Sequence, residues 1–145
     1  MNFHRASLAA VYATGANVEG ADLSAADLSG AYFVKCRCAL ATFTGADLRV
    51  AKFSECFFIS SSFDSTNMRR SDFGGTHFSG VTFNHAILAE AQFEDTVFRD
   101  CQFEEADLRE ANLVGASLVN VRLPKANLSG ARVYGTSAWS VDLTD

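Results

Sequence analysis

The chain has 145 residues, of which 48% are hydrophobic and 20% are charged, and its formal net charge is −5. This composition suffices for one buried core and excludes an intrinsically disordered chain. There is no apolar run long enough to cross a membrane and no signal peptide over residues 1–10, so we expect a cytoplasmic protein without membrane contact. The acidic balance and the lack of an extended basic face argue against direct binding to nucleic acid.

From Phe3 to Leu143, apolar residues recur at every fifth position, which gives 29 consecutive centres. Leu or Phe fills 23 of them, and Ala lies two residues before the centre in 15 of the 29 repeats. A helix turns about 100° per residue, so this spacing would scatter the centres around all its sides. A long strand is excluded because its faces alternate every two residues. The spacing instead predicts a three-residue strand, such as residues 46–48, followed by a two-residue corner.

A second period of twenty residues is nested in the first. Between Phe43 and Phe103, the non-aromatic centres are Leu48, Met68 and Leu88, which lie twenty residues apart. Four sides of five residues therefore make one coil. Nine of the ten glycines fall on the second corner residue, a position that suits turns with a positive φ. We predict a single all-β domain over residues 1–145, a quadrilateral parallel β-helix of about seven coils of 20 residues.

Several segments share Ala, then Asp or Asn, then Leu. They include residues 21–24, 46–49, 106–109 and 126–129. This pattern resembles the A(D/N)LXX signature of the pentapeptide-repeat family, and the resemblance covers essentially the whole chain. It implies that the β-helix is right-handed, but it does not specify a partner, because the repeats themselves are structural. Residues 134–143 also resemble the closing segment of longer family members in which a signalling domain follows. The alternative is that Tyr134 and Trp139 cover the last coil.

All four cysteines fall on inward positions, Cys38 at a centre and the other three two residues before one. Cys36 and Cys56 are twenty residues apart, so we expect them on adjacent coils within disulfide reach. The simpler interpretation, small buried thiols in a reducing cytoplasm, is favoured. No Cys or His spacing is typical of zinc, and the three histidines fall on different sides or distant coils. We expect no catalytic residues, cofactor or metal.

Surface charge is uneven along the chain. Residues 90–110 carry eight acidic and two basic side chains, a net charge of −6. The predicted acidic belt consists of Glu90, Glu94, Asp95, Asp100, Glu104, Glu105 and Glu110. The predicted basic column consists of Arg49, Arg69 and Arg109, with Arg70 beside it. Gyrase-inhibiting relatives lay acidic charge along a rod so that a topoisomerase binds protein instead of duplex DNA. The belt here forms a ring rather than a lengthwise stripe, and a merely solvated surface is its simplest interpretation.

An apolar patch is predicted on the outside, formed by Leu40, Phe57, Ile59 and Val97. Phe57 is the one phenylalanine of 13 that lies off the five-residue spacing. Scattered exposed apolar residues are the competing interpretation. The predicted function is a non-enzymatic protein-binding scaffold with a protein partner of unknown identity, and unpaired backbone edges at the end coils would allow a homodimer. A DNA-mimicking modulator of gyrase or another topoisomerase is the alternative.

Overall fold

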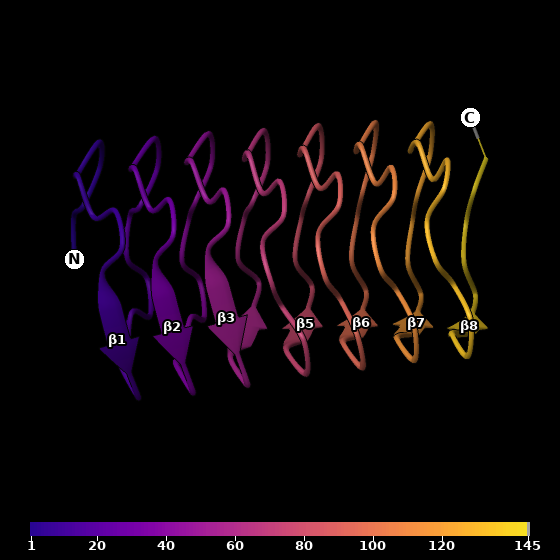
Figure 1. Cartoon of the computed structure of the whole chain (residues 1–145), viewed down its shortest axis with the longest axis horizontal. Helices are drawn as coiled ribbons and strands as arrows, with labels where there is room; N and C mark the ends of the chain where they lie inside the picture. Colours follow the sequence, from indigo (N-terminus) through magenta and orange to yellow (C-terminus); the bar gives the residue numbers. More distant parts are fainter. Residues whose placement is uncertain (145) are drawn as a thin grey trace.

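The protein is one continuous coiled ribbon, with successive coils stacked from the N-terminal to the C-terminal end (Figure 1). The computed structural model describes residues 1–144, and these contain no helix. They form eight strands of three residues each. The strands are β1 (Tyr12–Thr14), β2 (Tyr32–Val34), β3 (Lys52–Ser54), β4 (Phe57–Ile59), β5 (His77–Ser79), β6 (Val97–Arg99), β7 (Ser117–Val119) and β8 (Ser137–Trp139).

Every coil pairs in parallel with the next at an offset of twenty residues. One column of bridges runs from Asn2 through Asp22 and onward in steps of twenty to Arg122 and Asp142. The backbone N–H of Phe3, for example, donates to the carbonyl of Asp22 at 2.7 Å. The predicted period of twenty residues and the all-β solenoid are confirmed.

The named strands lie on only two of the four walls. Strands β1, β2 and β3 form one sheet, and β4 to β8 form a second sheet on the next wall. Each begins one residue later than predicted, because it is centred on the large inward residue. The remaining walls pair through isolated bridges. Their corners are closed by a turn hydrogen bond, such as that from the N–H of Ala46 to the carbonyl of Phe43 at 2.8 Å.

The second corner residue has a positive φ at every repeat from Arg5 to Ser140, with values between 50° and 74°. Nine of these residues are glycine, as the sequence predicts, but nineteen carry a side chain. The left-handed conformation costs an ordinary residue about 1–2 kcal/mol. The coil therefore imposes this conformation through the hydrogen bonds between coils.

The core is a column of phenylalanine rings that fills the tube. Phe63 is fully buried and stacks on Phe43 at 4.6 Å and on Phe83 at 5.3 Å between ring centroids. Rings on neighbouring walls meet edge to face, as for Phe58 and Phe63 at 5.1 Å. Both arrangements suit the quadrupole of the ring. The predicted inward direction of the centres is confirmed in the middle coils.

Small polar residues are also buried, and each is satisfied. The hydroxyls of Thr76 and Thr96 donate to the carbonyls of Phe53 and Phe73 at 2.6 and 2.9 Å. The four cysteines are fully buried free thiols, as predicted, and the N–H of Cys36 lies 3.4 Å from Sγ of Cys56. Burial raises the pKa of the Cys56 thiol to about 12, so this thiol stays protonated and unreactive.

Candidate interaction surfaces

The apolar patch lies on the wall formed by β4, β5 and β6. The side chains of Leu40, Phe57 and Ile59 are 62%, 50% and 53% exposed, whereas Val97 is less exposed and half-buried. Phe57, His77 and Val97 lie in register on three successive coils. The Phe57 ring stacks on the His77 ring at 5.2 Å and 19°, so His77 extends the patch. The sequence places His77 twenty residues after Phe57, and this spacing would have identified it.

Shallow hollows lie on both sides of Phe57 and Ile59. The hollow toward the N-terminal end is also lined by Lys35, Arg37 and Ala39. The hollow toward the C-terminal end is lined by residues of β5 and β6, including Val97 and Arg99. Within residues 1–144, neither Arg37 nor Arg99 takes part in an ion pair. The sequence interpretation missed both arginines, although each lies in a column with a patch residue.

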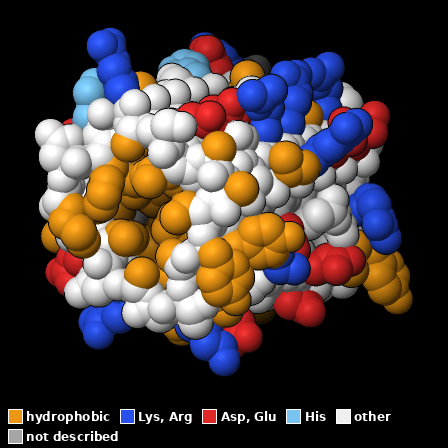
Figure 2. All heavy atoms as spheres, turned by 60° about the vertical axis from the view of Figure 1, so that its left-hand side comes forward, with side chains coloured by type: hydrophobic (Ala, Val, Ile, Leu, Met, Phe, Trp, Pro, Cys, Tyr) orange, Lys and Arg blue, Asp and Glu red, His pale blue; other side chains and the backbone are white. Residues whose placement is uncertain are grey.

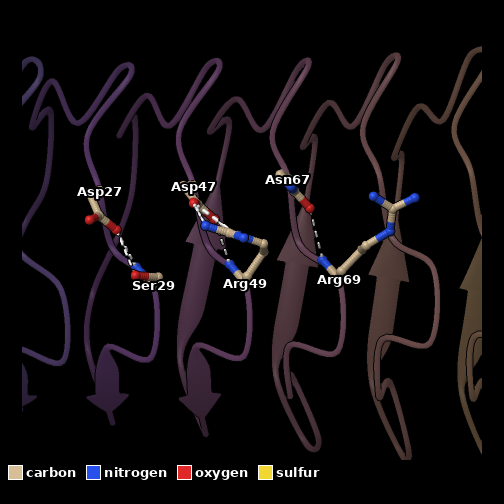
Figure 3. Close-up of polar contacts among 6 residues, drawn as sticks. All are labelled: Asp27, Ser29, Asp47, Arg49, Asn67 and Arg69. Atoms are coloured by element: carbon tan, nitrogen blue, oxygen red, sulfur yellow. Dashed lines mark hydrogen bonds and ion pairs between the residues drawn. The ribbon is translucent and has the colours of Figure 1, made fainter.

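The wall opposite the patch shows why the repeat carries Asp or Asn. Side-chain oxygens of Asp27, Asp47 and Asn67 accept the backbone N–H two residues later, at 3.0, 3.1 and 3.4 Å (Figure 3). Each bond satisfies a donor that the corner leaves free, in the manner of an Asx turn. The signature residue is therefore a structural cap. Its function is local, and it is not a binding site.

The same caps neutralise most of the predicted basic column. The Nε of Arg49 donates to both carboxylate oxygens of Asp47 at 2.8 and 2.9 Å. Arg109 donates to the two carboxylate oxygens of Asp107 from Nε and Nη2, each at 2.8 Å. These bonds lower the pKa of both carboxyls. Figure 3 shows the Arg49 guanidinium folded back on Asp47, while that of Arg69 extends away from Asn67.

The basic column of Arg49, Arg69 and Arg109, with Arg70 beside it, is largely paired with carboxylates and is interrupted along its length. Arg70 pairs with Glu90 at 2.8 Å, which lowers the pKa of that carboxyl, and Ala89 interrupts the column between Arg69 and Arg109. Arg69 takes part in no ion pair within residues 1–144, because a neutral amide replaces the carboxylate at position 67. Asp47 and Asp107 pair within one coil, two residues from their arginines, whereas Glu90 reaches Arg70 from the next coil.

The acidic belt does face outward, but some of its carboxylates are paired. Glu105 lies 3.3 Å from His85 and 3.7 Å from Lys125, and Glu94 accepts a hydrogen bond from Asn112 at 2.8 Å. The described residues contain no ion pair for Asp95, Asp100, Glu104 or Glu110. The belt thus combines free and neutralised carboxylates.

Both end coils expose apolar surface. Figure 2 turns the N-terminal end forward and shows a hollow there bordered by hydrophobic side chains. Phe3, Leu8, Ala13 and Val18 of that coil are only partly buried. At the other end, a hollow of about 320 Å³ is lined almost entirely by apolar residues. There the inward residues shrink from Phe to Leu and then to Val133 and Ala138. Tyr134 and Trp139 are 86% and 71% exposed, so they do not cover this hollow.

Across residues 1–144, no three Cys, His, Asp or Glu side chains are placed to hold a metal ion. The same part of the chain has no helix that combines the length and the hydrophobicity needed to span a membrane.

Comparison with known proteins agrees with the coil geometry. Residues 16–93 match the family model of the pentapeptide repeat region, and residues 76–113 and 101–137 match the model of the pentapeptide repeats. The chain belongs to the pentapeptide repeat family. Among curated proteins, none matches this pentapeptide repeat chain.

Solved structures of family members share the fold at low sequence identity. A pentapeptide repeat protein, Rfr23, from the cyanobacterium Cyanothece 51142 is 16% identical with a TM-score of 0.53, over 90% of this chain and 89% of that one. A second, from the thylakoid lumen of Arabidopsis thaliana, is 20% identical with a TM-score of 0.53, over 77% and 70%. QnrB1, a plasmid-mediated fluoroquinolone resistance protein, is 17% identical with a TM-score of 0.44, over 93% and 85%. At these identities the likeness to the first two proteins concerns the fold alone.

Proposed function

We propose that this pentapeptide repeat protein is a non-enzymatic protein-binding scaffold that acts through its rigid outer walls. The observation that carries the proposal is the apolar patch on the β4–β6 wall. Three of its side chains are at least half exposed on a surface whose backbone is fixed by hydrogen bonds to the coils on either side. A rigid apolar surface with a polar rim is typical of protein interfaces. Its partner is a protein.

Substitution of the patch tests this proposal. Phe57→Asp places a charge at the centre of the patch without removing a core residue. Val50→Asp is the matched control, because Val50 is 58% exposed and lies on a different corner of the tube. Immobilised protein is used to capture partners from a lysate of the source cells. We expect a partner that the wild type and Val50→Asp retain and Phe57→Asp loses. Equal capture by both variants would remove the patch from the proposal.

The acidic belt supports the second candidate, a DNA-mimicking modulator of gyrase or another topoisomerase. Its free carboxylates would compete with duplex DNA for a basic surface of the enzyme, and salt would weaken this competition. A supercoiling assay with purified protein tests the candidate directly. Replacing Asp95, Asp100, Glu104 and Glu110 by their amides should abolish any effect. If micromolar wild-type protein leaves supercoiling unchanged, the candidate fails.

The apolar end coils support one further contact, the end-to-end pairing of two copies. Stacking one end hollow on another would bury the side chains that both leave exposed. Trp139→Ser should weaken such pairing, as measured by sedimentation of the purified protein. A mass that is unchanged by this substitution would argue against it.

A further inference from the structure

The charges around the apolar patch are arranged so that the wall complements a second copy of itself. Lys35 and Arg37 lie on the coil before Phe57, and Asp95 and Asp100 lie on the coil that carries Val97. Along the tube axis, the surface of this wall therefore changes from cationic through apolar to anionic. We propose that two copies associate side by side with antiparallel axes, patch against patch. This inference rests on the proposed function, because it names the partner of the same surface.

A twofold axis across the wall, between the coils of Phe57 and His77, produces this arrangement. It places the Phe57 coil of one copy against the His77 coil of the other. It also places Lys35 opposite Asp95 of the second copy, and Arg37 opposite Val97, between Asp95 and Asp100. Such an interface is isologous, so every favourable contact occurs in duplicate. The parallel arrangement is disfavoured, because it sets Arg37 against Arg37 and Asp95 against Asp100.

Neighbouring charges reduce this attraction but do not reverse it. Lys35 lies 3.7 Å from Glu55 of its own chain, and Arg99 lies beside Asp100. Arg37, Asp95 and Asp100 take part in no ion pair within residues 1–144, so they remain available to a partner. Asp100 accepts one hydrogen bond, from Asn120 at 3.1 Å, and this bond leaves its charge in place.

The size of the wall sets the strength of the contact. Four coils at a spacing of about 4.8 Å by one wall of about 15 Å give an interface on the order of 300 Å² per copy. Stable dimers bury about 800 Å² per partner. The association is therefore weak and reversible, and its electrostatic part falls as the salt concentration rises.

Sedimentation equilibrium of the purified protein tests the proposal without any other ligand. The monomer has a mass of 15.6 kDa. At about 50 mM salt, we expect the average mass to rise toward twice this value between about 20 µM and about 1 mM protein, and to fall back at about 500 mM salt. A monomer at every concentration would overturn the inference. The capture experiment with lysate would then still stand, so the two failures are distinguishable.

Charge reversal identifies the arrangement. Lys35→Glu with Arg37→Glu, or Asp95→Lys with Asp100→Lys, should each weaken association about tenfold, because the twofold axis doubles every lost contact. Lysine is tolerated at these corners, since Lys35 and Lys125 already have a positive φ there. The fourfold variant restores opposite charges and should recover wild-type association within about twofold. Failure of this recovery in a folded variant, or loss of association in Trp139→Ser alone, would refute the side-by-side dimer.

Discussion

Phe73 offers the most direct test of the packing. Its ring is fully buried and has four aromatic neighbours, with centroids 5.0 Å from Phe53, 5.5 Å from Phe93, 5.6 Å from Phe78 and 6.2 Å from Phe63. Truncation of a buried Phe to Ala costs about 3–5 kcal/mol. Each aromatic pair adds about 0.5–1.5 kcal/mol beyond area burial, so we expect Phe73→Ala to lie near the upper end of that range.

Urea unfolding followed by circular dichroism measures this loss. With a slope of about 2 kcal/mol per molar urea, the midpoint should fall by about 2 M. Phe73→Leu is the matched control, because Leu fills the equivalent inward position on another wall. It should cost about 1.5 kcal/mol or less, since most of the volume is kept. A loss below about 1 kcal/mol for Phe73→Ala, or equal losses for both variants, would refute the stacked-ring core.

Three further outcomes follow from the corners, the carboxylates and the thiols. Val50→Gly should raise the free energy of unfolding by about 1 kcal/mol in the same urea assay, because φ is 53° at Val50 and glycine adopts this conformation without strain. Gly45→Ala should lower the free energy of unfolding by a similar amount, because φ is 67° at Gly45. The pKa of Asp47 is lowered by its hydrogen bonds to Arg49, so the stabilisation from its charged form is present above the unfolded pKa of about 4 and is lost as pH falls through the folded pKa. In thermal unfolding, the midpoint temperature should therefore decline below about pH 4, and it should decline less in Asp47→Asn. The folded protein should not react with a thiol reagent at about pH 8, whereas the unfolded chain exposes four reactive thiols. Burial blocks access to the cysteines and raises the pKa of Cys101 to about 11. Rapid labelling of the folded protein would contradict this burial.

The coil could be predicted because single residues at fixed spacings determine it. A large side chain at every fifth position predicts one inward residue per wall. The spacing of twenty residues between Leu48, Met68 and Leu88 then predicts four walls per coil. Glycine at the second corner residue showed where φ is positive. The sequence did not show that nineteen other residues share this conformation, because the pairing between coils overrides the preference of each residue.

The choice between strand and isolated bridge could not be predicted. All eight named strands precede corners that lack their own hydrogen bond. The inward residues after these corners are Ala16, Cys36, Cys56, Ser61, Val81, Cys101, Val121 and Val141. Most of them are larger than alanine, but Ala16 shows that the size of this residue alone does not decide the closure.

The surface was predicted in position but not in charge state. Phe57 and Ile59 were assigned correctly to one exposed wall, and His77 adds a ring that the sequence interpretation left out. The arginines of the basic column lie where the sequence placed them, but Asp47 and Asp107 serve both as corner caps and as their ion-pair partners. An interpretation based on like charges in one column omits the carboxylates in the next.

The offset of twenty residues between paired positions has a consequence for how such a chain can change. Loss or duplication of twenty residues shortens or lengthens the tube and leaves every downstream side chain on its original wall. Insertion of only five residues preserves the repeat but rotates everything beyond it by a quarter turn. Such an insertion between residues 12 and 57 would leave Tyr12 on its wall and move Phe57 to the next wall. Length and angular phase are thus separately adjustable in this chain.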